Sequence, residues 1–208
     1  MEKNFMGSSP SRRVFLAKAL CVGPLCVGCT RLLAQGPASP QKTAATSKFL
    51  ANSDMTFKEV YQFSYQGFIY MMLALGEDLG REKLVEMLKN ASSRAATEGV
   101  RRTAPPPPNN TLAAFRAAMT DPKTSRFWDH VLTRTTVEQS ERVCELRITE
   151  CLWAETFRDA NAADIGYAST CHPDFAAASA FNSKMKLIRT KTLMQGDSHC
   201  NHRWVVEA

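Results

Sequence analysis

Four consecutive prolines, Pro105 to Pro108, divide this chain of 208 residues into two parts with different patterns. Proline lacks the backbone N–H that a helix needs, and its ring clashes with the preceding turn. A run of four therefore excludes a helix and favours a stiff extended segment. We interpret the run as a spacer between helices; a proline-rich ligand for a recognition module is the alternative.

Before the prolines, the apolar residues repeat at steps of three and four, which predicts amphipathic helices. The first begins after Thr56, a suitable N-cap, with Glu59 three residues on as in a capping box. A second is expected from about Arg81 to Val100. The expected inward-facing residues are Phe57, Val60, Tyr61, Tyr65, Phe68, Ile69 and Met72 in the first helix, and Leu84, Val85, Leu88, Ala91 and Ala95 in the second.

After the prolines, helical segments alternate with segments of period two. Over Thr135–Thr149, Cys144, Leu146 and Ile148 alternate with charged residues, which predicts a strand with one wet face. A second strand is expected from Met185 to about Thr190, where Met185 and Leu187 alternate with Lys186 and Ile188, and a third over Arg203–Val206. Short helices are expected over Thr111–Met119, Ser125–Thr133, Cys151–Asn161, Ala163–Ser169 and Phe175–Phe181, and a turn at Gly196-Asp197. The predicted fold class is α+β: a helical N-terminal half, with a small antiparallel sheet and helices in the C-terminal half.

The N-terminus carries a different signal. Ser11-Arg12-Arg13-Val14-Phe15-Leu16-Ala17-Lys18 resembles the twin-arginine export motif, and an apolar stretch too short to span a bilayer follows from Ala19 to Val27. We therefore expect a periplasmic or cell-envelope protein that is exported by the twin-arginine machinery, with Arg12 and Arg13 as its recognition pair. An amphipathic N-terminal helix that happens to contain two arginines is the alternative.

Two processing sites are compatible with this signal. Cleavage can fall near Ala34, or Cys29 can be lipidated, since Cys26-Val27-Gly28-Cys29 loosely resembles a lipobox. In either case the membrane is contacted only through the signal peptide or a lipid. The expected organisation is a signal peptide over residues 1–35, a flexible tether over 36–54 and an α+β domain over 55–208.

The charge distribution gives no case for a nucleic-acid partner. The formal net charge is +6, from 26 basic and 20 acidic residues. Five basic residues and one acidic residue precede residue 35, which leaves 21 basic and 19 acidic residues, or +2, in the rest of the chain. The basic balance is therefore mainly a targeting feature.

Four cysteines remain beyond the signal segment: Cys144, Cys151, Cys171 and Cys200. Outside the cytoplasm, four cysteines can form disulfides in three pairings. The ionisable residues also form two groups, Cys171-His172-Pro173-Asp174 and Asp197-Ser198-His199-Cys200-Asn201-His202. Thiolate, imidazole and carboxylate groups serve in nucleophilic and acid–base catalysis, and they also bind zinc, although the spacing here matches no standard zinc motif.

Several short motifs occur in order along the chain: Cys151-Leu152-Trp153-Ala154-Glu155, Gly166-Tyr167, Cys171-x-x-Asp174, Phe181-Asn182, Arg189-Thr190-Lys191-Thr192-Leu193 and Gly196-Asp197-x-x-Cys200-x-His202-Arg203-Trp204. Together they resemble the L-2-amino-thiazoline-4-carboxylic acid hydrolase family. The resemblance covers residues 55 to 206 and is sharpest from Val137 onward. It implies a hydrolase acting on carbon–nitrogen bonds other than peptide bonds, whose named substrate is a small ring that opens to N-carbamoyl-L-cysteine.

Such a reaction needs a nucleophile or activated water, a proton donor and a cation for the substrate carboxylate. As a hypothesis, Cys171 or Cys200 is the nucleophile, activated by His199 or His202, and Asp174 or Asp197 orients the imidazole or activates water. Arg189 or Arg203 holds the carboxylate through a bidentate pair. We expect the two groups of ionisable residues to face one cleft, with the thiol pKa of Cys171 lowered by a helix N-terminus.

Two other functions fit the same residues. The first is a non-catalytic envelope protein that binds a metal or a small ligand through the Cys/His/Asp cluster, and the second is a disulfide-stapled protein without a site. The sequence specifies no cofactor, although a divalent metal is compatible with these side chains.

Overall fold

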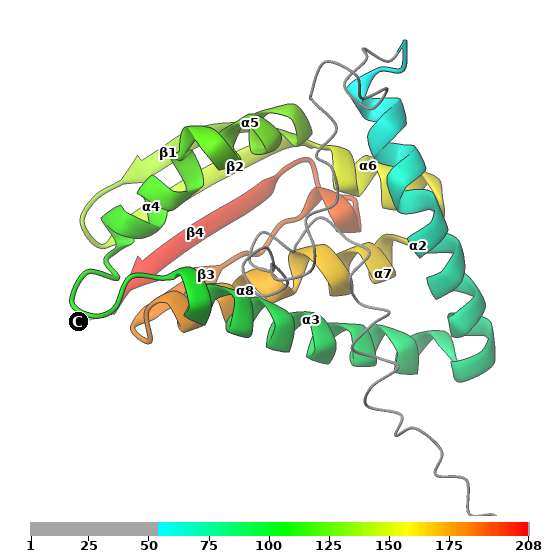
Figure 1. The fold of residues 1–208 in the computed structure, drawn as a ribbon, viewed down its shortest axis with the longest axis horizontal. Coiled ribbons are helices and arrows are strands. Elements are labelled where there is room, and N and C mark those ends of the chain that lie inside the picture. Colours follow the sequence, from blue (N-terminus) through cyan, green and yellow to red (C-terminus); the bar gives the residue numbers. More distant parts are fainter. Residues whose placement is uncertain (1–53, 208) are drawn as a thin grey trace, which may run out of the picture. The chain divides into compact units, whose positions relative to one another are not determined.

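The computed structural model describes residues 54–207 (Figure 1). The predicted twin-arginine pair Arg12–Arg13, the cleavage site near Ala34, the lipidation site Cys29 and nearly all of the tether lie outside these residues. Among the described residues, no helix combines the length and the apolar character that a membrane span requires.

Two long helices open the described part of the chain, α2 (Phe57–Leu79) and α3 (Arg81–Thr103). The capping box at the start of α2 is confirmed: the Thr56 side chain accepts from the Glu59 N–H at 3.2 Å, and the Glu59 carboxylate accepts from the Thr56 N–H at 2.7 Å. The helices meet at Gly80, whose φ of +85° suits glycine best. The prolines lie between α3 and the next helix, which confirms the spacer, but the run is not extended throughout: Pro107 and Pro108 form a turn, in which the Asn109 N–H donates to the Pro106 carbonyl at 2.9 Å.

The inward faces of both helices differ in part from the prediction. Phe57 and Val60 of α2 are 42% and 46% exposed, so the first turn of α2 does not face inward as expected.

In α3, Ala91 and Ala95 are exposed, whereas Leu84 is buried and Ser92 is half-buried. Ser92 donates from its hydroxyl to the Ala168 carbonyl at 2.7 Å, so a polar residue that the pattern did not select lies on the inward face. The partner is a carbonyl in an irregular helical turn, which sequence periodicity cannot show.

The sheet has four antiparallel strands in the order β1-β2-β4-β3, namely β1 (Leu132–Gln139), β2 (Val143–Cys151), β3 (Met185–Ile188) and β4 (Cys200–Val206). The single strand predicted over Thr135–Thr149 is a hairpin of two strands. Its turn is closed by the Ser140 side chain, which accepts from the Val143 N–H at 3.0 Å. Two short helices precede the hairpin, α4 (Leu112–Thr120) and α5 (Pro122–Val131).

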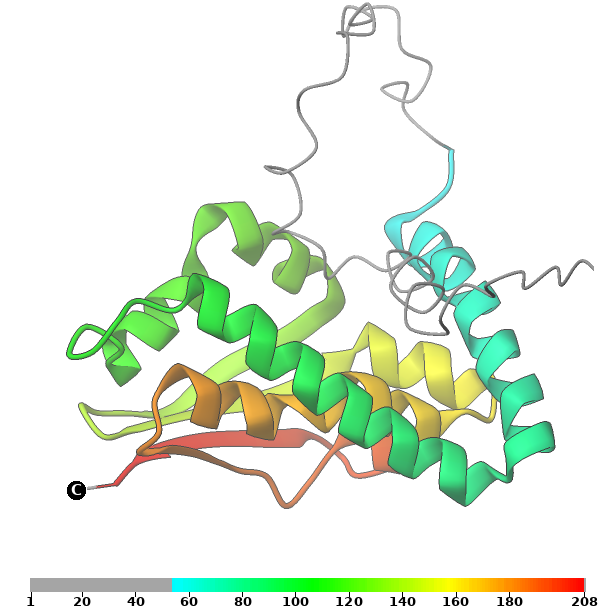
Figure 2. The same cartoon turned by 60° about the horizontal axis from the view of Figure 1, so that its bottom comes forward.

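The helices α3 and α8 lie over the same face of the sheet (Figure 2). The core forms between this face and the helices, from alternate residues of each strand. Its buried members include Cys144, Ala178, Phe181, Met185, Leu187 and Trp204. The predicted fold class is confirmed.

The last helical region contains an irregular turn. After α6 (Leu152–Asp159), the chain forms α7 (Ala163–Gly166), a π-helical turn (Tyr167–Cys171) and α8 (Pro173–Phe181), so Ala163 to Phe181 is one continuous helical path. Pro173 accounts for the wider turn, because a proline inside an α-helix clashes with the carbonyl four residues earlier. The His172 N–H therefore bonds to the Tyr167 carbonyl, five residues back, at 2.7 Å.

Candidate functional site

The candidate site is built around Arg189, directly after β3. Met185 and Leu187 of β3 are buried and Lys186 and Ile188 are exposed, so the alternation directs Arg189 to the helix side of the sheet. Its side chain is only 2% exposed. Three groups accept from its guanidinium: Nη1 donates to Asp174 Oδ2 at 2.8 Å and to His202 Nε2 at 3.1 Å, and Nη2 donates to the Cys171 carbonyl at 2.6 Å.

Two aromatic rings flank the same guanidinium. The Arg189 Cζ atom lies 4.9 Å from the Phe175 ring centroid and 5.8 Å from the Tyr167 centroid, within the range of cation–π attraction. The third guanidinium nitrogen, Nε, is buried and has no partner among the described residues. An unpaired buried N–H is costly, so this atom is a natural contact for a ligand or a water molecule.

The contact with Arg189 fixes the tautomer of His202. A guanidinium only donates, so His202 Nε2 must be the unprotonated acceptor and the ring proton must be on Nδ1. Burial, together with the neighbouring Arg189 charge, lowers the pKa of His202 to about 3. His202 is therefore a neutral hydrogen-bond donor at ordinary pH and a weak base.

Asp174 stands in the first turn of α8 and is half-buried. Desolvation raises the pKa of its carboxyl group, and the Arg189 guanidinium opposes that shift. With 39% of its side chain exposed, Asp174 is the acidic member of this cluster that a water molecule can reach. A carboxylate with a raised pKa is a stronger base than usual, which suits proton abstraction from water.

The thiol pKa of Cys171 is raised, whereas we expected it from the sequence to be lowered. Cys171 ends the π-helical turn inside a continuous helical path, and no helix N-terminus faces it. Burial raises the pKa of the Cys171 thiol to about 12, although the Arg189 charge acts in the opposite direction. The expected lowering of this pKa was wrong. In the resting structure Cys171 is a thiol, and its backbone carbonyl makes the contact with Arg189.

Cys151 belongs to this region, although the predicted site residues did not include it. It caps α6, with its sulfur accepting from the Ala154 N–H at 3.4 Å, and burial raises its pKa to about 11. Its thiol interacts electrostatically with Cys171, Cys200 and Asp174. Its position at the end of a strand and the start of a helix was the available sequence signal. All four cysteines of the described part are free thiols.

Cys200 is the first residue of β4 and is buried on the helix side, where its sulfur accepts from the Leu193 N–H at 3.2 Å. Asp197 and His199, which precede Cys200 in the sequence, make their side-chain contacts within the loop before β4. Asp197 Oδ2 accepts from the Thr192 N–H at 2.8 Å and so closes this loop, and His199 Nδ1 lies 3.0 Å from the Ser198 hydroxyl. The polar contacts of Arg189 with the described residues are with Asp174, His202 and the Cys171 carbonyl, and the predicted catalytic roles of Asp197 and His199 stay predictions.

Arg203 alternates with His202 and therefore lies on the other face of the sheet. It is paired there with Glu138 and, at 2.7 Å, with Glu145. The structure thus separates the two arginines that were predicted to hold a substrate carboxylate. Arg189 joins the buried cluster, while Arg203 contributes to an ion-pair network between β1, β2 and β4.

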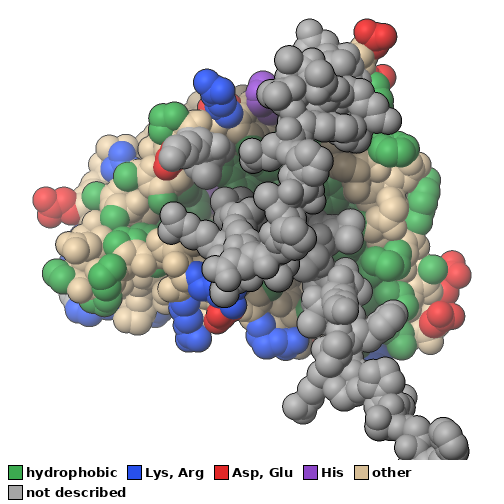
Figure 3. Space-filling model, in the orientation of Figure 1, with side chains coloured by type: hydrophobic (Ala, Val, Ile, Leu, Met, Phe, Trp, Pro, Cys, Tyr) green, Lys and Arg blue, Asp and Glu red, His purple; other side chains and the backbone are tan. Residues whose placement is uncertain are grey.

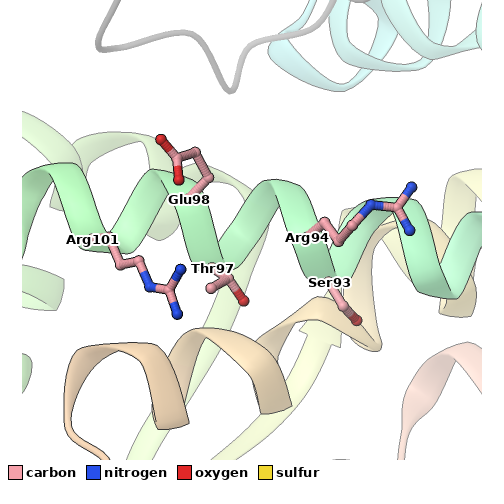
Figure 4. Close-up of a pocket in the computed structure, with 5 residues that line it drawn as sticks. All are labelled: Ser93, Arg94, Thr97, Glu98 and Arg101. Carbon is pink, nitrogen blue, oxygen red and sulfur yellow. The ribbon is translucent and has the colours of Figure 1, made fainter.

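Two surface grooves among the described residues can be compared with the cluster. One, of about 850 Å³, has Cys151 in its wall, together with Lys58, His130, Glu150 and Leu193. The other, of about 440 Å³, is lined by residues of α3 alone and contains none of the predicted site residues (Figure 4). Of these two grooves, only the one at Cys151 contains a thiol of this region, and neither is lined by Asp174, Arg189 or His202.

Within residues 54–207, no three His, Cys, Asp or Glu side chains are arranged to hold a metal ion. Two side chains of the cluster that could bind a metal, Asp174 and His202, are instead hydrogen-bonded to Arg189.

Comparison with known proteins places this geometry in a family. The profile of the L-2-amino-thiazoline-4-carboxylic acid hydrolase family matches residues 60–204, which is more than half of the chain. The chain belongs to this family. The match includes Asp174, Arg189 and His202 as well as the four cysteines, and the resemblance expected from the sequence is confirmed. Membership supports a hydrolase-type function.

No curated protein matches the chain. Among solved structures, it is similar to trafficking protein particle complex subunit 3 from Naegleria fowleri covalently bound to palmitic acid, at 9% identity, covering 73% of this chain and 95% of that one with a TM-score of 0.44. It is also similar to the phenol-responsive sensory domain of the transcription activator PoxR with phenol, at 11% identity, covering 67% and 73% with a TM-score of 0.44. Likenesses at this level carry no argument about function.

Proposed function

We propose that this family member is an exported hydrolase that opens a small cyclic substrate, with a ring carbon between nitrogen and sulfur, by adding water. The observation that carries the proposal is the buried Arg189, which brings together Asp174, His202 and Cys171 and keeps one unpaired donor, Nε. A cluster with fixed donors and one water-accessible carboxylate suits acid–base catalysis on a small polar molecule.

In this reaction the water oxygen bonds to the ring carbon while Asp174 takes the first water proton. The electrons of the carbon–nitrogen double bond move to the ring nitrogen, which receives that proton. The new hydroxyl then becomes a carbonyl as the carbon–sulfur bond breaks, and the second water proton goes to the departing sulfur. The substrate and one water thus give a ring-opened product with a free thiol.

The other residues position the substrate and stabilise charge. The Nδ1–H of His202 is a donor for the oxygen that develops negative charge, since its Nε2 is held by Arg189. The unpaired Arg189 Nε is a donor for the substrate carboxylate. The raised thiol pKa values of Cys171 and Cys151 support water over a resting thiolate as the nucleophile.

A thiol-release assay tests this function. Purified protein is incubated with 2-amino-thiazoline-4-carboxylate and with related rings, and the new thiol is titrated at neutral pH after the protein has been removed. We expect release by the natural protein and a loss of at least about 100-fold in Asp174→Asn. Asp164→Asn is the matched control, because Asp164 pairs with an arginine, Arg81, outside the cluster. Equal activity in the two variants would remove Asp174 from the mechanism.

The proposed export has a separate test. Replacing Arg12 and Arg13 together with lysine keeps the charge and should retain the precursor inside the cell, whereas Arg31→Lys should not. Fractionation of cells followed by immunoblotting distinguishes the outcomes. Unchanged export of the double variant would show that a route other than the twin-arginine machinery is used.

A further inference from the structure

The helix α2 has a second apolar face that the fold leaves uncovered. Its inner face buries Tyr61, Ile69 and Met72 against the domain. On the opposite side, Phe63 is 73% exposed and Tyr70 is 59% exposed. The side chains on the α2 side of the molecule are largely apolar in Figure 3. The exposed large residues of α2 are Phe57, Val60, Phe63, Tyr70, Met71, Leu75 and Leu79.

The outer face has the spacing of a helix-pairing seam. Val60, Phe63, Gly67, Tyr70 and Ala74 follow one another at steps of three, four, three and four, and all are exposed. Apolar residues that alternate in this way line the contact between two paired helices. A helix that only packs on its own domain needs one apolar face. The second apolar stripe therefore indicates a contact with another helix.

The exposed apolar side chains of α2 form a large patch. Seven large side chains have exposed fractions of 36–73%. The largest apolar patch of an ordinary monomer covers roughly 300–600 Å², and a standard interface buries about 800 Å² on each partner. The outer face of α2 supplies the apolar centre of such an interface, and the residues beside the helix supply the rest.

The ends of α2 differ in charge. In the first turn Lys58 and Glu59 balance each other, and Lys58 is paired with Glu155, whereas the last turn carries Glu77 and Asp78 and no basic residue. The helix dipole adds positive character to the first turn and negative character to the last. Two copies of α2 that run antiparallel therefore place unlike ends together, whereas parallel copies place like ends together.

Gly67 lies near the middle of α2, and a Cβ atom built on it meets no atom within 4 Å. Val60 and Ala74 of the seam lie seven residues on either side of Gly67, and Phe63 and the exposed Met71, which lies beside the seam, lie four residues on either side. We propose that α2 forms a homodimer interface, in which two copies of the helix cross antiparallel about a two-fold axis at Gly67. Phe63 then packs against Met71 of the partner subunit, and the reverse.

A membrane surface fits the same face less well. Amphipathic helices that bind anionic lipid carry several basic residues beside the apolar stripe. In α2 the one basic residue, Lys58, is outnumbered by the acidic residues Glu59, Glu77 and Asp78.

Molar mass in solution tests the interface. Light scattering on the full chain should give a dimer, and Phe63→Glu should give a monomer with an unchanged circular dichroism spectrum. Tyr70→Lys repeats the test at the other side of Gly67. Val137→Glu is the matched control, because Val137 is 53% exposed but lies in β1, and this variant should remain a dimer. A monomeric natural protein at all concentrations, or dimers in both α2 variants, would overturn the proposal.

Disulfide trapping tests the orientation. In the antiparallel arrangement Gly67→Cys faces its own copy and should cross-link under mild oxidation, whereas two copies of Val60→Cys are about 20 Å apart, at a rise of about 1.5 Å per residue, and should not. The unsubstituted chain is the control for its own cysteines. Efficient cross-linking through Val60→Cys would indicate parallel helices and overturn the two-fold axis at Gly67.

Discussion

Arg189 Nη1 lies 2.8 Å from Asp174 Oδ2, and this ion pair ties the end of β3 to the first turn of α8. The arginine is buried and the carboxylate is half-exposed, so the pair joins the core to solvent. Because the same guanidinium also holds His202 and the Cys171 carbonyl, one side chain fixes the relative positions of β3, β4 and α8.

We expect Arg189→Lys to lower the free energy of unfolding by about 2–4 kcal/mol and to abolish the proposed activity. A single ammonium group cannot donate in the three directions that the planar guanidinium serves. Urea unfolding followed by fluorescence gives the stability. Arg203→Lys is the control on the outer face of the sheet, where a change of less than about 1 kcal/mol is expected. A loss of similar size in both variants would contradict the special role of Arg189.

The pH dependence of stability should carry the signature of His202. Its pKa is about 3 in the folded state, against an ordinary value of 6.5. The unfolded chain therefore binds a proton in this interval that the folded protein does not, and the free energy of unfolding falls as pH falls from about 6.5 to about 3. The slope from this residue approaches about 1.4 kcal/mol per pH unit.

His202→Gln keeps an acceptor for Arg189 and removes the titration, so its stability should depend less on pH in the same interval. The raised pKa of Asp174 contributes with the opposite sign, since it adds stability at low pH that is lost as pH rises. That contribution is common to both proteins, and the difference between their curves isolates His202. Parallel curves would show that folding does not lower the pKa of His202.

The native thiols of Cys151 and Cys171 should react slowly at neutral pH. With pKa values of about 11 and about 12, only a small fraction is thiolate, the reactive form. We expect alkylation by iodoacetamide at pH 7.5 to be at least about 100-fold slower than in urea-unfolded protein. Peptide mass spectrometry assigns the labelled residues. Fast labelling of native Cys171 would indicate a thiolate and would support a cysteine nucleophile in place of activated water.

Tyr61 and Tyr65 offer a matched pair of hydroxyl deletions. The Tyr61 hydroxyl is buried beside Tyr65 and has no well-oriented hydrogen-bond partner among the described residues, whereas the Tyr65 hydroxyl accepts from Trp153 Nε1 at 3.0 Å. Tyr61→Phe should leave the free energy of unfolding unchanged or raise it by up to about 1 kcal/mol, and Tyr65→Phe should lower it by about 1–2 kcal/mol. Thermal unfolding measures both. A clear destabilisation by Tyr61→Phe would indicate a hydrogen bond through water.

Gly166 is required by close packing. A Cβ atom at this position would lie 2.6 Å from Phe157 Cγ and 2.7 Å from Met194 Sδ. We expect Gly166→Ala to destabilise the protein by about 1–3 kcal/mol through overpacking. In Gly99→Ala the added atom meets nothing within 4 Å, and this substitution in a helix should stabilise by about 0.5–1 kcal/mol. Opposite shifts in melting temperature are the expected result.

Sequence reasoning located much of the candidate site because its residues follow local rules. The alternation of Met185 and Leu187 with Lys186 and Ile188 predicted a strand, and the structure has that strand just before Arg189. The ordered motifs gave the family, which the profile match confirms. The same reasoning failed at Cys171, because it placed a helix start there. The π-helical turn before Pro173 instead continues the helix, and burial raises the thiol pKa.

The sequence by itself determined the elements: the capping box at Thr56, the helices on either side of the prolines, the α+β class and the family. These depend on the residues' spacing and on contacts within a few positions, which a linear pattern contains. Only the tertiary structure decided which of two similar arginines is buried. Arg189 and Arg203 both occur near the end of the chain, but strand register sends one to the core and the other to Glu138 and Glu145. Register depends on pairing between strands that are distant in the sequence. This pairing also decides which ionisable groups are buried, and burial shifts their pKa values.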